Sequence, residues 1–216
     1  MVRTRVTYLI IILLVISNVE CVQAQTGVFT DRRDGNTYQT ITIGKRVWLR
    51  ENLRFKTSLS FFPNVNKDTS DLKYGNYYSY NEMNTICPEG WHVATIKEFE
   101  EYLHALAVLN NIPDSSIIRT TQQNRDSAAH ISIGGLNPFN DTLLNFPLIG
   151  WVEGKKVENK KSVTIWLADT HTNDDKFHAH IGSLGYFIHT HLHNVIDKPK
   201  RVRKFTVRCV CEVKPG

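Results

Sequence analysis

The 216-residue sequence has no apolar run long enough to cross a membrane. Its longest run, from Tyr8 to Ile16, is well short of the ~20 residues that a spanning helix needs. Its 12 glycines and 7 prolines follow no short period, which excludes collagen and low-complexity classes. With 41% hydrophobic and 22% charged residues, the composition is typical of a folded globular protein.

The common catalytic signatures are also missing. The sequence has no Gly-x-Ser-x-Gly elbow, no His-Glu-x-x-His zinc helix, no glycine-rich phosphate loop and no dinucleotide fingerprint. We therefore expect no enzyme and no cofactor. Two enzymatic alternatives stay open: a Cys87 thiol with His92 as its base, and a degradative enzyme with paired acids drawn from Glu51, Glu89, Glu98 and Glu153.

The N-terminus has the pattern of a secretory signal peptide. Arg3 and Arg5 precede the apolar run, and Val22-Gln23-Ala24 supplies small residues for cleavage before Gln25. We predict that residues 1–24 are removed and that the protein is secreted or lies in the cell envelope. A transmembrane anchor and a lipoprotein at Cys21 are weaker alternatives, because the run is short and Glu20 precedes that cysteine.

Cleavage leaves 24 Lys and Arg against 20 Asp and Glu, a mildly basic balance. Much of the excess lies in residues 198–204, which could meet an acidic polysaccharide or an anionic envelope surface, or simply be a solvated loop. For an exported protein we expect no nucleic-acid partner, and membrane contact only through the signal peptide before cleavage.

Three cysteines remain after cleavage, so at most one intramolecular disulfide can form. Cys209 and Cys211 occupy alternate positions of a predicted half-buried C-terminal strand, and Cys87 would pair with one of them. The alternative is three buried thiols.

The rest of the sequence is rich in predicted strands. A meander is expected over 28–53, followed by a polar loop over 54–73 and aromatic density at 74–80, which is more typical of core packing than of a sugar-stacking surface. Thr95 and Glu98 form a capping box for a helix over about 95–109. Residues 113–126 and 131–147 are predicted as loops, and a second β-rich region follows from Gly150. No linker divides residues 25–216, so we expect a single domain.

Five ordered motifs give this sequence a family resemblance. They are Phe29-Thr30-Asp31-x-Arg33-Asp34-Gly35-x-Thr37-Tyr38, Ile43-Gly44-x-x-x-Trp48-x-x-Glu51-Asn52-Leu53, Tyr74-Gly75-x-x-Tyr78, Cys87-Pro88-Glu89-Gly90-Trp91-His92 and Val207-Arg208-Cys209-Val210. Together they resemble the Fibrobacter succinogenes major paralogous domain over about residues 28–212, a family of exported proteins of Bacteroidetes and Fibrobacteres.

The resemblance implies a disulfide between Cys87 and Cys209, for which Cys211 is a competitor. It also implies an α+β fold similar to the C-type lectin-like arrangement, with antiparallel strands, one main amphipathic helix and long loops. Residues from about 131 to 160 would then form a candidate binding surface. The Glu-Pro-Asn, Gln-Pro-Asp and Trp-Asn-Asp segments of calcium-dependent lectins do not occur.

Six of the nine histidines lie between His171 and His193. With a turn at Gly182-Ser183-Leu184-Gly185, His178 would lie across from His189, with His180 and His191 on the same face. Such a face could bind Zn, Ni or Cu, respond to pH, or only be the polar side of a hairpin.

From these features we predict an exported, non-catalytic binding or surface-interaction module of the bacterial envelope. Its partner would be a polysaccharide or an envelope protein, recognised through loops on a disulfide-tied scaffold. A metal- or pH-responsive protein using the histidine hairpin is the first alternative, and a degradative enzyme is the second.

Overall fold

The computed structural model describes residues 25–62, 74–113, 117–119, 128–133, 141–158, 161–170, 176–182, 185–191 and 203–213. The predicted signal peptide, residues 1–24, lies outside the described residues, as do His171, His193 and most of the basic stretch 198–204.

The first sheet is antiparallel and has the strand order β1-β2-β3-β13-β4. Its strands are β1 (Thr26–Thr30), β2 (Thr37–Ile43), β3 (Arg46–Leu49), β4 (His92–Val93) and β13 (Cys209–Glu212). The predicted meander is therefore confirmed, with turns at Gly35 and Gly44 that both have positive φ. The C-terminal strand β13 lies between β3 and β4, far from its neighbours in sequence.

A second antiparallel sheet has the order β5-β6-β11-β10-β9. It consists of β5 (Ile117–Arg119), β6 (Ala128–Ile133), β9 (Ser162–Thr170), β10 (Lys176–Gly182) and β11 (Gly185–His191). A third, small sheet joins β12 (Arg203–Lys204), β7 (Trp151–Glu153) and β8 (Lys156–Glu158). Isolated bridges from β9 to Gly150 and to Thr206 connect the second sheet to the chain around it.

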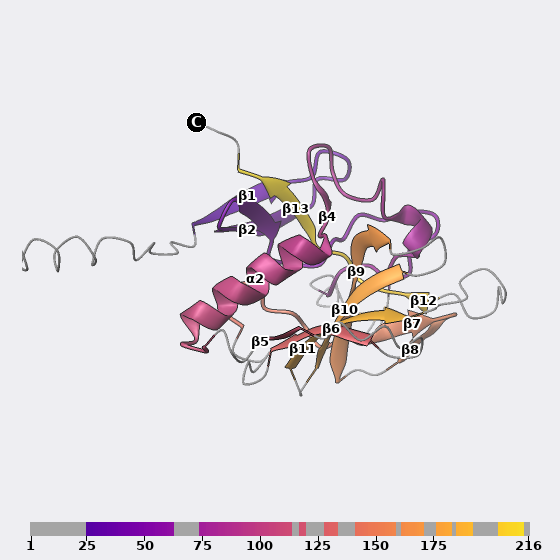
Figure 1. Cartoon of the computed structure of the whole chain (residues 1–216). Helices are drawn as coiled ribbons and strands as arrows, with labels where there is room; N and C mark the ends of the chain where they lie inside the picture. The colour runs from indigo at the N-terminus through magenta and orange to yellow at the C-terminus, as the bar shows by residue number, and fades with distance from the viewer. Residues whose placement is uncertain are drawn as a thin grey trace, which may run out of the picture.

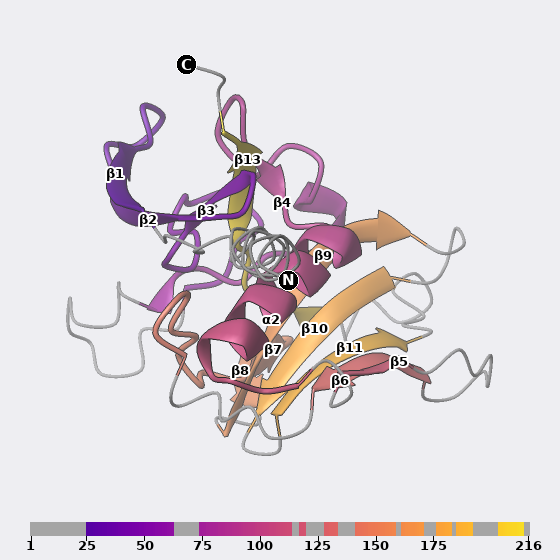
Figure 2. The same ribbon diagram turned by 60° about the vertical axis from the view of Figure 1, so that its left-hand side comes forward.

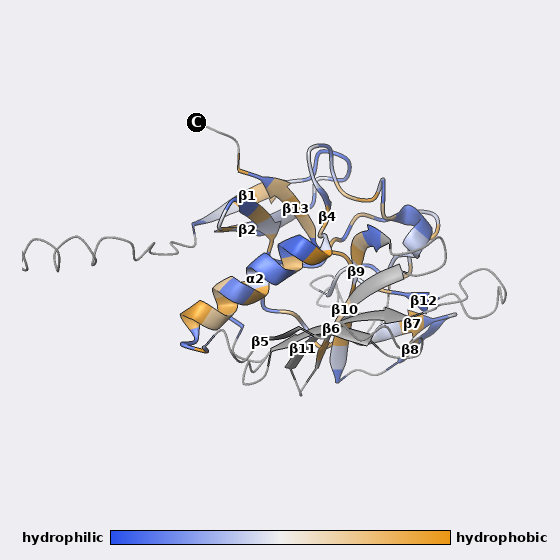
Figure 3. Cartoon of the chain, in the orientation of Figure 1, coloured by the Kyte–Doolittle hydropathy of each residue, from blue (hydrophilic) through white to orange (hydrophobic). Residues whose placement is uncertain are grey.

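The described residues contain one α-helix, α2 (Ile96–Leu109), and a short 3-10 helix, η2 (Tyr80–Glu82). Thr95 caps α2: its hydroxyl accepts from the Glu98 backbone N–H, and the Glu98 carboxylate accepts from the Thr95 backbone N–H. The helix begins as predicted. It presents hydrophobic and hydrophilic residues on different sides, and Figure 3 shows hydrophobic residues at its C-terminal end.

Helix α2 lies between the first and second sheets, as two views of the chain show (Figures 1 and 2). Its buried residues Phe99, Tyr102, Leu103 and Leu106 pack with Ile41, Trp48 and Val210 of the first sheet and with Val163, Ile165 and Ile181 of the second. A second core lies around Tyr38, Leu53, Tyr78, Trp166, Phe205 and Cys209. The strand β9 contributes to both, because Ile165 belongs to the first core and Trp166 to the second.

Two predictions about local structure were wrong. Residues expected to form loops around 113–126 and 131–147 include β5 and the end of β6, which pair with each other, while β6 also pairs with β11. The C-terminal segment is not half-buried along its whole length: every residue from Phe205 to Val210 is buried, whereas Cys211 is half-buried and Glu212 and Val213 are exposed. Phe205, Val207 and Cys209 belong to the second core and Val210 to the first.

The fold is α+β with mostly antiparallel strands, as predicted. Among the described residues no helix combines the length and the apolar character needed to cross a membrane.

Candidate functional site

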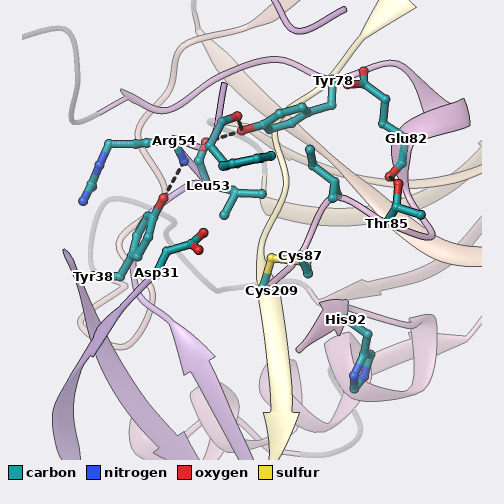
Figure 4. Close-up of a disulfide and its surroundings, with 12 residues drawn as sticks. Asp31, Tyr38, Leu53, Arg54, Tyr78, Glu82, Thr85, Cys87, His92 and Cys209 are labelled. Carbon is teal, nitrogen blue, oxygen red and sulfur yellow. Dashed lines mark hydrogen bonds between the residues drawn. A yellow bond between two sulfur atoms is a disulfide. The ribbon is translucent and has the colours of Figure 1, made fainter. Parts of the chain in front are cut away.

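A disulfide joins Cys87, just before β4, to Cys209 at the start of β13, as Figure 4 shows. The two Cα atoms are 5.8 Å apart and 122 positions separate the residues in sequence. The pairing implied by the family resemblance is therefore the one that the structure contains. Cys211 lies outside this disulfide and is half-buried. A Cys87 thiol acting with His92 as its base is contradicted, because the sulfur is already bonded.

Several long irregular segments are fixed to the scaffold at one place, which we call the loop junction and define by Asn52, Leu53, Gly75, Asn76, Tyr78 and Arg208. The Asn52 side chain donates to the Tyr74 carbonyl at 2.9 Å and accepts from Arg208 Nε at 2.9 Å. The Leu53 N–H donates to the Val207 carbonyl, and its own carbonyl accepts from the Asn76 N–H. Segments around residues 53, 75 and 207 are thereby locked together.

Side chains complete the loop junction by binding backbone that belongs to no strand. Asn76 Nδ2 donates to the carbonyls of Arg54 and Phe55 at 2.8 and 3.1 Å. The Tyr78 hydroxyl donates to the carbonyls of Leu53 and Phe55 at 3.0 and 2.7 Å. Figure 4 shows this hydroxyl beside Leu53, with Tyr38 approaching Arg54 from the other side. Burial raises the pKa of Tyr78 well above its usual value, so its hydroxyl stays a proton donor.

Arg208 brings a charged side chain to the centre of this junction. It is fully buried, its Nη1 donates to the Leu49 carbonyl at 3.2 Å, and its guanidinium carbon lies 4.5 Å from the centre of the Phe146 ring. Its Nη2 has no hydrogen-bond partner among the described residues. The sequence did not predict this role. The alternation of residues along a strand predicts which face a side chain lies on, but it does not predict whether other parts of the chain cover that face.

The segment 141–149 lies beside the loop junction and is also held by side chains. Asp141 is buried, and its carboxylate accepts from the Tyr102 hydroxyl at 2.6 Å and from the N–H groups of Leu143 and Leu144. Arg50 donates to the carbonyls of Leu143 and Thr142 at 2.8 and 2.9 Å. Thr142 and Asn145 remain exposed, so this predicted part of the candidate binding surface has a fixed backbone with side chains facing water.

A second polar cluster joins α2 to the first sheet. His92 Nε2 lies 2.9 and 3.1 Å from the two Glu98 carboxylate oxygens, and Arg46 Nε lies 3.0 Å from Glu98 Oε1. Burial tends to raise the pKa of Glu98, but hydrogen bonds from His92 and Thr95 outweigh it and lower that pKa to about 2. Arg46 also pairs with Glu212 at 2.7 Å. The cluster fixes the helix N-terminus.

The other predicted acidic residues have separate surroundings. Glu51 pairs with Arg54, Glu153 pairs with Arg203, and Glu89 is exposed.

Two of the tyrosines between residues 74 and 80 belong to the interior. Tyr77 and Tyr78 are completely buried, so these two cannot form a sugar-stacking surface. Tyr77 instead donates its hydroxyl hydrogen to the Ile149 carbonyl at 2.7 Å.

The predicted histidine hairpin is present in the backbone. Strands β10 and β11 pair with Ile181 opposite Tyr186 and with His178 opposite His189. His180 lies opposite Phe187, and His191 lies opposite Lys176. No group of three potential ligands lies together among the side chains that the structure describes. The side chains of these four histidines lie outside that set.

The five sequence motifs now have a common place in the structure. Residues from the second, third and fifth motifs meet at the loop junction, and the fourth supplies Cys87 of the disulfide. The first adds Arg33, whose Nη1 donates to the Ile86 carbonyl at 2.8 Å, next to that cysteine. The family model of the Fibrobacter succinogenes major domain matches residues 41–211, most of the chain. The chain belongs to this family.

Comparison with curated proteins and comparison with solved structures each found no match. The C-type lectin-like arrangement therefore stays a prediction. In this member of the Fibrobacter succinogenes major domain family, the motif residues hold loops and core together, and the side chains that face outward from 141–149 are not part of the motifs.

Proposed function

We propose that this protein is an exported, non-catalytic binding module that recognises a polysaccharide or an envelope protein through loops fixed on the disulfide-tied scaffold. The observation that supports this most is the way segment 141–149 is held. Arg50 and Asp141 bind its backbone and Tyr102 holds the Asp141 carboxylate, while Thr142 and Asn145 face solvent.

Fixed loops suit recognition because binding then costs little ordering of the protein. Loops carried by a rigid scaffold are also where binding residues concentrate in folded proteins. Asn145 has a positive φ of 45°, an uncommon conformation for a residue other than glycine. Such backbone often accompanies a functional surface.

The test is a glycan and polysaccharide array with the purified mature protein, together with capture of envelope proteins by the immobilised protein. Each is run with EDTA and again with added zinc. We expect binding that ignores EDTA and that is lost in Thr142→Arg, which places a bulky charge on the exposed loop. Thr26→Arg is the matched control at an exposed threonine on β1, and it should bind like the unchanged protein.

Three results would contradict the proposal. Equal binding by Thr142→Arg and the unchanged protein would remove the loop from the interface. No binding to any glycan or envelope protein would contradict the proposed recognition function. Turnover on a polysaccharide or peptide panel would support the alternative of a degradative enzyme.

A further inference from the structure

We propose that the β10–β11 hairpin carries a binding site for a transition-metal ion of the zinc, nickel and copper group, built from His178, His180 and His189. This inference is independent of loop recognition and rests on strand register. His178 and His189 are direct partners in an antiparallel ladder, and His180 lies two residues along β10. Side chains alternate along a strand, so all three positions belong to one face.

The spacing of these positions suits one shared ion. Directly opposed residues in an antiparallel pair have Cβ atoms about 5 Å apart, and diagonal neighbours are about 7 to 8 Å apart, within reach of aromatic rings. His178–His189 is a direct pair and His180–His189 is a diagonal one. The three positions form a compact triangle, with His178–His189 as its direct cross-strand side.

The neighbouring strands add no carboxylate at the positions registered with this triangle. On β9, Trp166 is paired with His178 and Thr164 with His180; on β6, Ala129 is paired with His189. A donor set of imidazoles favours zinc, nickel and copper, whereas magnesium and calcium require oxygen ligands.

The ladders on both sides are irregular at this pair. The β10–β9 register shifts between Lys176 and His178, and the β11–β6 register shifts between Ile188 and His189. The β10–β11 ladder between them is continuous from Lys176 to Gly182. Bulges change the direction of side chains and are common next to functional sites.

His191 is the matched comparison within the same hairpin. It shares the face of the triangle but lies directly opposite Lys176, whose ammonium would repel a cation. We therefore assign the ion to the His178, His180 and His189 end and expect His191 to matter little.

The experiment is isothermal titration of the full mature chain, purified without a histidine tag, with zinc chloride and nickel chloride at neutral pH. We expect one ion per chain, released by EDTA. His178→Gln and His189→Gln should each weaken binding at least tenfold, and the double variant should abolish it. His191→Gln and His104→Gln, the latter on α2, should change affinity less than threefold.

A second measurement keeps the test independent of variant folding. The electron paramagnetic resonance spectrum of the unchanged protein with one copper(II) ion should show coupling to at least two imidazole nitrogens, and lowering the pH below about 6 should release the ion as the imidazoles protonate. Absence of stoichiometric binding would overturn the site. So would full affinity in a folded His178→Gln/His189→Gln variant, or an equal loss in His191→Gln.

Discussion

Arg208 places a full positive charge inside the protein beside neutral hydrogen-bond acceptors, Asn52 and the Leu49 carbonyl. Burial lowers the pKa of this guanidinium to about 10, while the nearby Asp141 opposes the shift. The residue stays charged at neutral pH and holds the loop junction from within. A buried charge with few partners is costly, so the surrounding contacts must compensate for its desolvation.

Replacing Arg208 should therefore strongly destabilise the fold. Arg208→Ala removes the hydrogen bonds to Asn52 Oδ1 and the Leu49 carbonyl and opens a cavity against Phe146, so we expect a loss of about 3 to 5 kcal/mol in the free energy of unfolding. Urea titration followed by tryptophan fluorescence measures it. Arg32→Ala, at an exposed arginine, is the control and should change stability by less than about 0.5 kcal/mol.

Gly75 allows a close approach that no side chain would permit. A Cβ atom there would lie 2.6 Å from Asn52 Cβ and 2.9 Å from the Leu53 carbonyl oxygen, and φ is +80°. Gly35 has a similar φ of +75°, with nothing within 4 Å of its Cβ position. Substitutions at these two glycines therefore distinguish the cost of a positive φ, which both share, from the cost of a steric clash, which only Gly75 has.

We expect Gly35→Ala to cost about 1 to 2 kcal/mol, the cost of positive φ alone. Gly75→Ala should cost at least about 2 kcal/mol more, because the loop junction must also shift. Thermal and urea unfolding of both variants measures the difference. Equal losses would mean that the junction absorbs the added methyl group without strain.

At the scale of elements, α2 depends on the cluster at its N-terminus. Glu98 accepts hydrogen bonds from the helix cap and from His92, and Asp169 of β9 accepts from the Ile96 N–H at 2.5 Å. These carboxylates satisfy N–H groups that have no partner within the helix. The helix is thereby tied to both neighbouring sheets.

The Glu98 carboxyl gives a pH dependence of known sign. Its pKa is about 2 in the folded protein against an ordinary 4.5, so its ionised form stabilises the fold above pH 5 by about 3 kcal/mol, and this is lost as pH falls toward 2. The stability gap between the unchanged protein and Glu98→Gln should shrink over that window in urea titrations. Glu89→Gln, at an exposed position, should leave the profile unchanged. A constant gap would contradict the assignment.

Elements with strong local signals could be predicted from the sequence. The Thr95–Glu98 capping box marked the start of α2, and Gly182 with Gly185 set the register of the β10–β11 hairpin. Strands β5 and β6 were not predicted, because the sequence around them is polar and rich in glycine and they are held by pairing with strands distant in sequence. The loop junction could not be derived either: the motifs named its residues, but only the folded chain brings Asn52, Gly75 and Arg208 together.

For the whole molecule, the disulfide joins the segment before β4 to β13, the last of the described strands. Closing a loop of 122 residues restricts the unfolded chain, an effect of about 5 kcal/mol in the chain-entropy model. Cys87→Ser/Cys209→Ser should lose stability of this order in urea titrations under oxidising conditions. Cys211→Ser is the control, and it should retain the disulfide and lose less than about 1 kcal/mol. A similar loss in Cys211→Ser would mean that the half-buried thiol, and not the bond, carries the effect.

The position of β13 between β3 and β4 also sets an order of assembly. Its residues are synthesised after all the other described elements, yet they lie inside the first sheet between two earlier strands and, with the adjoining residues Phe205 to Arg208, contribute to both cores. A growing chain that ends before Cys209 has open edges on β3 and β4 and no partner for Cys87. The first sheet can therefore be completed only after β13 has been synthesised, whereas β1, β2 and β3 pair with one another without it.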